Sequence, residues 1–276
     1  MLGAMTRIAV ASDLHIEFER SGEPEPGPAE SGLHPSDGPD LGPLHGEADL
    51  LILAGDIDLG TAGIAYADEA ALFLGIPAIY VMGNHEAYHG DLGAVLAGCR
   101  AAAAETDGRV LFLENDAVEV AGVRVLGCTL WTDYAINGDA DCGMRDAAQG
   151  LADHRLIRLA GRGFTPADAL ARHAKSRSWL EGELARGAEG PVVVVTHHAP
   201  VRAAIEPRYE GSPLSPAFVS DLEELIDAHE PAAWIWGHTH YSVDVMRGAT
   251  RCISAQRGYP GEHEAAASFR PAVIEV

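Results

Sequence analysis

The sequence predicts an α/β protein in which two mixed β-sheets face each other and helices flank them. Three observations support this fold class. Short apolar runs, many of them β-branched, recur along the chain, helix-like stretches separate them in the first half, and tight hairpins follow later. Strands that are buried on both faces give continuous apolar runs, and alternation of strands and helices indicates a parallel sheet.

Five of the apolar runs are predicted strands, at residues 8–11, 50–53, 78–82, 192–195 and 232–236. Four helices are predicted, over residues 62–74 and 91–105, from Thr165 to about residue 185, and from Ser220 onward. Thr165 is a good N-cap residue, and the proline after it suits the first helical position. At Ser220, Glu223 stands three residues later and would complete a capping box.

Two antiparallel hairpins are predicted where short strand-like runs flank a turn. Residues 118–120 and 123–125 enclose an Ala-Gly turn, and residues 243–246 and 250–253 enclose an Arg-Gly-Ala turn. Antiparallel pairs beside parallel strands give mixed sheets, which is why two such sheets packed together are expected.

The whole chain, residues 1–276, is expected to form a single domain. Residues 21–46 are rich in proline, glycine and acidic side chains, and this composition predicts a surface insertion. Residues 137–163 show weak periodicity and are a candidate lid segment.

Composition limits the functions open to this chain. Its formal net charge of −22 and its lack of any basic run disfavour binding to nucleic acid or to anionic membranes. No run of about 18 purely apolar residues predicts a membrane span, and the N-terminus lacks the pattern of a secretion signal. The four cysteines show no Cys-x-x-Cys pairing, which predicts free thiols in a cytoplasmic protein.

Each predicted strand is followed directly by side chains that can bind a metal. Ligands bind at the carboxyl ends of strands in open α/β sheets, so these side chains are expected to meet at one rim. Eight residues are involved: Asp13, His15, Asp56, Asn84, His85, His197, His238 and His240. Oxygen and imidazole donors without a thiolate suit Mn, Fe, Zn, Co or Ni better than a structural cysteine–zinc site or a calcium site.

The spacing of these residues also favours a shared site. In an extended chain residues i and i+2 point the same way, so Asp13 and His15 can reach one metal, as can His238 and His240. All five blocks of donors resemble the pattern of the metallophosphoesterase (calcineurin-like) superfamily, in the family's order. The blocks are Asp13-Leu14-His15, Gly55-Asp56, Gly83-Asn84-His85-Glu86, His197 and Gly237-His238-Thr239-His240.

The resemblance implies a four-layer α-β-β-α sandwich and a site with two divalent or trivalent transition metals, Mn or Fe being favoured. The implied ligands of the first metal are Asp13, His15, Asp56 and His240. The implied ligands of the second are Asp56, Asn84, His197 and His238. Asp56 would bridge the two metals, and His85 would lie over the substrate without binding a metal.

The implied reaction is hydrolysis of a small phosphate ester by a hydroxide that bridges the metals, with Asp56 and His85 as catalytic residues. Asn84, His198 and Arg158 are candidate substrate contacts, and Glu86 is a candidate to orient a histidine. A phosphodiester, for example a cyclic nucleotide, is favoured because the motif blocks contain no arginine to balance a doubly charged monoester. The alternatives are a phosphomonoesterase or protein phosphatase at the same site, and a non-catalytic scaffold. The oligomeric state is left open.

Overall fold

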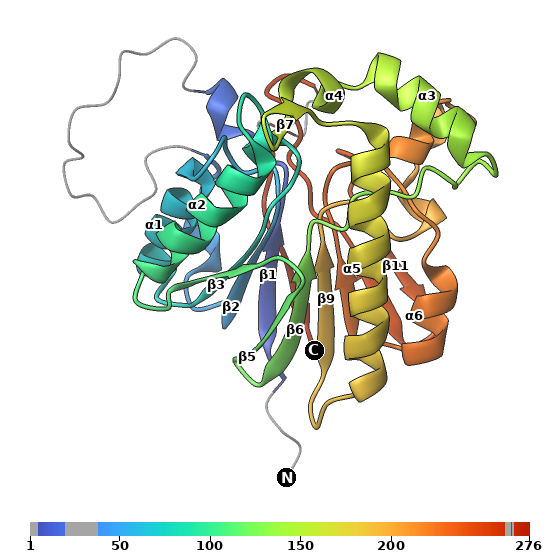
Figure 1. Ribbon diagram of the computed structural model, residues 1–276. Helices are drawn as coiled ribbons and strands as arrows, with labels where there is room; N and C mark the ends of the chain where they lie inside the picture. The colour runs from blue at the N-terminus through green and yellow to red at the C-terminus, as the bar shows by residue number, and fades with distance from the viewer. Residues whose placement is uncertain (1–4, 20–37, 263–265, 267) are drawn as a thin grey trace.

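The computed structural model describes residues 5–19, 38–262, 266 and 268–276. Two large β-sheets face each other, and helices cover both outer faces (Figure 1). The predicted fold class, a four-layer α-β-β-α sandwich, is confirmed.

The first sheet has the strand order β13-β1-β2-β3-β4. Its strands are β1 (Arg7–Ala11), β2 (Leu50–Ala54), β3 (Ala78–Val81), β4 (Val110–Leu113) and β13 (Ala272–Glu275). The first four run parallel, and β13 pairs antiparallel with β1 at the edge. β4 and β13 were not predicted, and β13 is a largely exposed edge strand without a continuous buried run.

The second sheet has the strand order β11-β12-β10-β9-β6-β5. Its strands are β5 (Asp116–Val120), β6 (Val123–Cys128), β9 (Val192–Thr196), β10 (Ala233–Ile235), β11 (Asp244–Arg247) and β12 (Thr250–Ile253). The four inner strands run parallel, and β11 and β5 are antiparallel edges. Both predicted hairpins are confirmed. The β5–β6 turn has φ values of 50° at Ala121 and 79° at Gly122, which suit a right-twisted hairpin.

Three apolar clusters hold the layers together. The cluster between the sheets includes Ile8, Val10 and Val195. The residues that alternate with them, such as Ala9 and Val194, pack instead into the clusters on the outer faces. A second cluster packs α1 (Ala62–Leu74) and α2 (Leu92–Ala104) onto the first sheet. A third packs α5 (Pro166–Arg186) and α6 (Glu223–His229) onto the second sheet. The strands are therefore buried on both faces, which explains their continuous apolar sequences.

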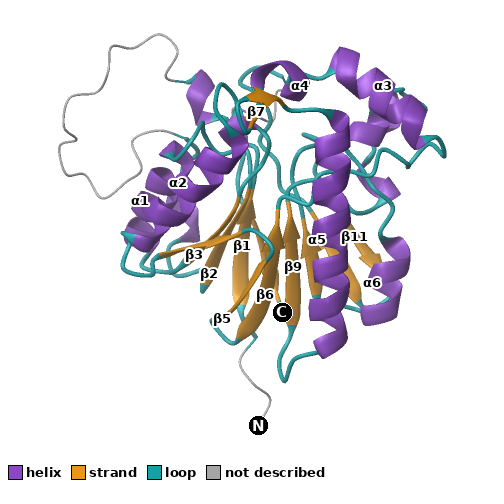
Figure 2. Cartoon of the chain, in the orientation of Figure 1, coloured by secondary structure: helices purple, strands orange, loops and turns teal. Residues whose placement is uncertain are grey.

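The parallel strands of both sheets end at the same side of the molecule. Figure 2 shows the loops that follow them gathered beneath α3 (Ala140–Gly150) and α4 (Asp153–Leu156). The short hairpin β7 (Arg158–Leu159) and β8 (Arg162–Gly163) follows α4 in the chain. The segment predicted as a lid therefore lies over the carboxyl ends of the strands.

Two local predictions require correction. In the predicted insertion, residues 20–37 lie outside the described part of the chain, but Leu41 and Leu44 are buried in the cluster beneath α1. This end of the segment is therefore only partly a surface feature: two leucines anchor it in the core, while Asp40, Gly42, Pro43, His45 and Gly46 are exposed. The expected capping box at Ser220 is absent, since α6 begins at Glu223 and the Ser220 hydroxyl instead donates to Thr132. By contrast, Thr165 caps α5 as predicted.

Candidate metal centre

The eight predicted donors all lie in loops that follow β1, β2, β3, β9 and β10. The structure brings them together at the rim where both sheets end. Seven of the eight are buried, and the His240 side chain is 11 % exposed. Their convergence follows from the parallel pairing of the strands, which places each strand end beside the next.

One group of converging donor atoms comes from Asp13, His15 and His240, whose atoms lie within 4.8 Å of one another. The Nε2 atoms of His15 and His240 are 3.0 Å apart, and His240 Nε2 is 3.5 Å from Asp13 Oδ1. Together with Asp56, these three residues are the ligands of the first metal that the family resemblance implies.

A second group comes from Asp56, His197 and His238, again within 4.8 Å. His197 Nε2 lies 3.4 Å from Asp56 Oδ2 and 3.0 Å from Asn84 Oδ1. Asp56 Oδ2 is also 4.0 Å from His15 Nε2, so one carboxylate oxygen faces both groups. The other oxygen of Asp56 accepts a hydrogen bond from the backbone N–H of His85 at 2.8 Å.

The backbone of the donors is unusual. Asp13, His15, Asp56, His238 and His240 have φ values between 49° and 72°, in the left-handed region that side chains other than glycine rarely adopt. The expectation of extended chain is therefore wrong at Asp13 and His15 and equally at His238 and His240. Asp13 and His15 still join one group, but His238 and His240 lie in different groups and do not reach one metal together. Such conformations cost about 1–3 kcal/mol each and tend to cluster at functional sites.

The free nitrogen atoms of the histidines fit a metal. His238 Nε2 is buried and has no hydrogen-bond partner among the described residues. The Nδ1 atoms of His15 and His240 face the carboxylates of Glu17 and Glu262, at 3.1 Å and 2.6 Å, which leaves their Nε2 atoms directed at each other. Histidines that bind metals commonly donate their second nitrogen to a carboxylate or carbonyl in this way.

The histidines of the site differ in the direction of their pKa shifts. Burial holds the pKa of His238 well below its ordinary value and also lowers the pKa of His15, so both are neutral and offer a lone pair. Burial also opposes a charge on His197, but the nearby Asp56 carboxylate outweighs it and raises the pKa of His197 to about 9. In the same way, His197 and His85 overcome the effect of burial and hold the pKa of Asp56 well below its usual range.

His85 lies beside the first group, and with His15 and Glu17 it forms a third cluster of converging donor atoms. Its Nδ1 is 3.0 Å from Glu17 Oε1, and its Nε2 is 3.1 Å from the hydroxyl of Tyr259. Burial works against a charge on His85, but Asp56 and Glu17 outweigh it and raise the pKa of His85. Both ring nitrogens are thus held, which fixes the orientation of the ring at the wall of the cavity.

The Asn84 amide has a fixed orientation. Its nitrogen donates to Asp153 Oδ1 at 2.9 Å and to the Tyr88 hydroxyl at 3.2 Å, and Tyr88 also donates to Asp153 at 2.7 Å. The amide oxygen must therefore face His197 and the second group. Asp153 belongs to residues 137–163, the segment predicted as a lid, so this segment contributes to the arrangement of the donors.

Glu86 performs a different role from the predicted one. Its carboxylate accepts from the backbone N–H groups of Asp56, Ile57 and Gly83 and from the Tyr80 hydroxyl, at 2.7–3.3 Å. Each oxygen thus receives two donors. Glu86 fixes the two loops that carry Asp56 and Asn84 and does not orient a histidine.

Two predicted substrate contacts lie away from the cavity. His198 is buried, with its ring 4.1 Å from that of His238 and 5.2 Å from that of Trp131. Arg158 is exposed, and its guanidinium donates to the carbonyl of Gly161 within the β7–β8 hairpin. The geometry therefore supports neither as a substrate contact, and places His198 behind a candidate ligand.

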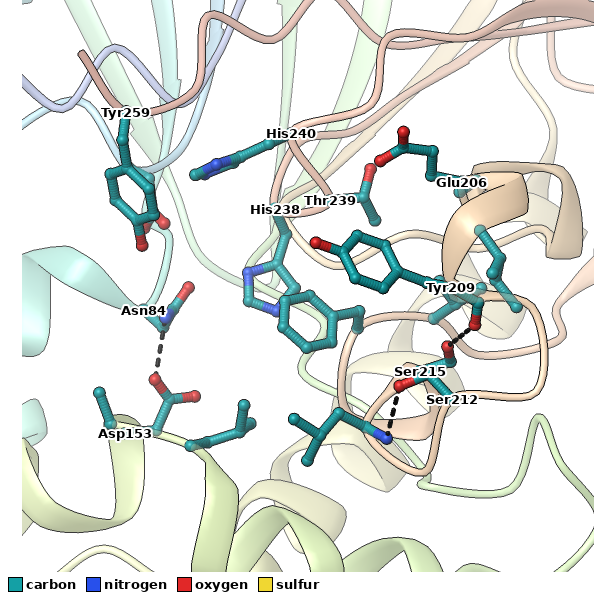
Figure 3. A pocket seen from close by; sticks show the side chains of 18 of the residues that line it. Asn84, Asp153, Glu206, Tyr209, Ser212, Ser215, His238, Thr239, His240 and Tyr259 are labelled. Atoms are coloured by element: carbon teal, nitrogen blue, oxygen red, sulfur yellow. Dashed lines mark hydrogen bonds between the residues drawn. The ribbon is translucent and has the colours of Figure 1, made fainter. Parts of the chain in front are cut away.

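A cavity of about 350 Å³ opens beside the donors. Figure 3 shows Asn84, His238, His240 and Tyr259 on one side and the segment that carries Tyr209 on the other. Much of the remaining lining is apolar or aromatic, although Glu206, Arg208, Ser212 and Ser215 also contribute. The apolar and aromatic residues are Leu151, Ala152, Ala204, Ile205, Tyr209, Leu214, Phe218 and Val219.

Several residues of the site were not predicted from the sequence. Glu17 stands two positions after His15, and an acid so close to a predicted ligand was a usable signal. Tyr259, Glu262 and Arg208 carry no local signal, because they reach the site only through the tertiary structure.

Comparisons with known proteins agree with this geometry. Residues 6–242 match the family model described as calcineurin-like phosphoesterase. The chain is 23% identical over 212 residues to an uncharacterized protein, L509, of Acanthamoeba polyphaga mimivirus, covering 70% of each chain. Its fold is similar to that of a phosphopantetheinyl hydrolase from Mycobacterium tuberculosis, with 17% identity, a TM-score of 0.62, and coverage of 100% and 97% of the two chains.

The protein is thus a phosphoester hydrolase with groups of residues that can bind metals. It belongs to the calcineurin-like phosphoesterase family, because the family model spans most of its length. The family is typically dependent on two metals, in keeping with the first and second groups of donors described above. Within the described residues, no helix is both long enough and apolar enough to span a membrane.

Proposed function

We propose that this protein hydrolyses a small phosphodiester at a site with two metals. The observation that carries the proposal is the pair of donor groups that share one oxygen of Asp56. Asp13, His15 and His240 would hold one metal, and Asn84, His197 and His238 would hold the other. The donor set, without thiolate, favours Mn or Fe. When bound, the metals supply Lewis-acid chemistry and an activated water at neutral pH.

The residues around the donors would orient the substrate and exclude water. His85 lies at the wall of the cavity, held by Glu17 and Tyr259, and is placed to donate a proton to the leaving oxygen. Asn84 would face the substrate phosphate as well as the second metal. His198, packed on His238, would position that ligand without touching the substrate.

The charges of the cavity support a diester over a monoester. Arg208 is the one arginine or lysine among the described residues that line it, and its guanidinium is paired with Glu206 at 2.6 Å. Four carboxylates also line it, from Asp56, Asp153, Glu206 and Glu262. A phosphomonoester carries a second negative charge, for which this cavity offers no free arginine. A diester carries a single negative charge, which bound metals could balance.

The apolar wall offers a place for the organic group of an ester. Phe218 stacks on His238, with ring centroids 4.6 Å apart, so the wall begins directly at the donors. Tyr209 extends over the cavity from the facing segment (Figure 3). An aromatic or alkyl substituent could lie there while its phosphate meets the metals, and a nucleoside is one such group.

The experiment compares hydrolysis of bis(4-nitrophenyl) phosphate and of 4-nitrophenyl phosphate by the manganese-loaded protein. We expect a larger kcat/KM for the diester. Asn84→Ala should lose most of this activity, because it removes a ligand of the second metal. Gln149→Ala, which removes an exposed amide on α3, is the matched control and should behave as the wild type.

Faster cleavage of the monoester would replace the proposal with a phosphomonoesterase at the same site. Full activity of Asn84→Ala would refute the ligand assignment. A protein that takes up no transition metal would favour the scaffold alternative.

A further inference from the structure

Residues 256–262 connect two parts of the metal centre, although they lie beyond residue 242, where the match to the family model ends. The backbone N–H of Gly258 donates to the carbonyl of Asp13 at 3.1 Å. The side-chain oxygen of Gln256 accepts a hydrogen bond from the backbone N–H of His240 at 2.6 Å. The segment is therefore held between the two loops that supply the first group of donors.

Glu262 fixes the ring of His240. Its Oε2 lies 2.6 Å from His240 Nδ1 and also accepts the backbone N–H of Tyr259 at 3.1 Å. A proton on Nδ1 that is shared with this carboxylate leaves the lone pair of Nε2 directed at Asp13 and His15. This arrangement selects the one tautomer of His240 that can bind a metal at the first group.

Tyr259 packs onto the same group and reaches the cavity. Its ring lies 4.4 Å from that of His15 and 4.5 Å from that of His240, between centroids, and its hydroxyl is 3.1 Å from His85 Nε2. A tyrosine hydroxyl ordinarily has a pKa of about 10, so it carries its proton at neutral pH. A protonated hydroxyl on the cavity wall can orient His85 and can also donate to a phosphate oxygen.

We infer that residues 256–262 form a part of the active site that the family model does not include. In it, Glu262 is a positioning residue for the metal ligand His240, and Tyr259 positions His85 and contacts the substrate. The inference rests on the proposed function, because it requires a metal at the first group and a phosphate ester in the cavity.

The role of Glu262 is tested by metal binding, without reference to catalysis. Glu262→Gln should weaken binding of Mn²⁺ at the first group by about tenfold to a hundredfold, measured by titration calorimetry. The absorption spectrum of bound Co²⁺ should change as well, because it reports the geometry of the ligands. Glu262→Asp keeps the charge and should be less affected. Glu224→Gln, an exposed acid on α6, is the matched control.

The role of Tyr259 is tested by kinetics. Tyr259→Phe keeps the ring and its packing, so metal affinity should stay as in the wild type. We expect kcat for the diester to fall by about tenfold to a hundredfold, because His85 loses one of its two partners. Tyr66→Phe is the matched control, since the Tyr66 hydroxyl is buried outside the cavity and has no hydrogen-bond partner among the described residues.

The possible failures can be distinguished. If the wild type binds metal and cleaves the diester, but Glu262→Gln keeps its metal affinity and Co²⁺ spectrum, the role of Glu262 is overturned while the proposed function stands. Unchanged kcat in Tyr259→Phe overturns the role of Tyr259 in the same manner. If the wild type itself binds no metal, the proposed function fails, and the inference fails with it.

Discussion

Gly83 offers a sharp test of the metal centre, because it packs directly against Asp56. A Cβ atom added at Gly83 would lie 2.1 Å from Asp56 Oδ1 and 2.7 Å from both Asp56 N and His197 Cε1. The backbone of Gly83 does not lie in the left-handed region, so alanine can adopt it. Gly83→Ala therefore adds a steric clash without backbone strain, and the clash falls on Asp56 and His197 of the second group of donors.

The size of the effect follows from these distances. An ordinary contact between such atoms is at least about 3.4 Å, so the Asp56 carboxylate or the Gly83 loop must move by more than about 1 Å. Overpacking of a well-packed site costs about 1–3 kcal/mol of stability. A shift of about 1 Å in the groups that position a substrate can reduce the rate about a hundredfold. We expect Gly83→Ala to lose about 1–3 kcal/mol and at least a hundredfold in kcat/KM.

The assays are urea unfolding, calorimetric titration with Mn²⁺ and hydrolysis of the bis-aryl phosphate. Gly182→Ala is the control, because a Cβ atom at this helical position in α5 has no atom within 4 Å. It should gain about 0.5–1 kcal/mol from helix propensity and keep its activity. If Gly83→Ala bound metal and cleaved the ester as well as the wild type, the close packing of Asp56 against Gly83 would not hold in solution.

Three further outcomes are expected. A chelator should abolish hydrolysis and lower Tm, because metal at a hundred times its Kd stabilises the folded protein by about 2.7 kcal/mol, and added Mn²⁺ should restore both. Glu86→Gln places an amide donor against two existing donors and should lose about 2–4 kcal/mol in urea unfolding, whereas a loss below about 0.5 kcal/mol would contradict its role in fixing the loops. Thr165→Ala removes the N-cap of α5 and should cost about 1 kcal/mol with unchanged kcat/KM; a drop in kcat/KM would link this helix to the site.

The donors could be predicted from sequence because each stands in a short block directly after a buried strand. The apolar run identifies the strand, and parallel pairing then brings the strand ends together without any knowledge of the loops. The backbone at these positions could not be predicted. Asp13 and His15 were expected in extended chain, but both adopt left-handed conformations that only the surrounding contacts can impose.

The sequence by itself determined the fold class, both hairpins, the start of α5 and the family, because these depend on local patterns of apolar residues, turn residues and ordered motifs. Tertiary structure alone decided which acids face the histidines, that Asp153 and Tyr88 orient Asn84, and that Tyr259 lies against His85. Except for Tyr88 with Asn84 and Glu17 with His15, these contacts join residues far apart in the chain. They form only because the packing of the layers brings these residues together, and no local sequence pattern reports which distant residues will meet.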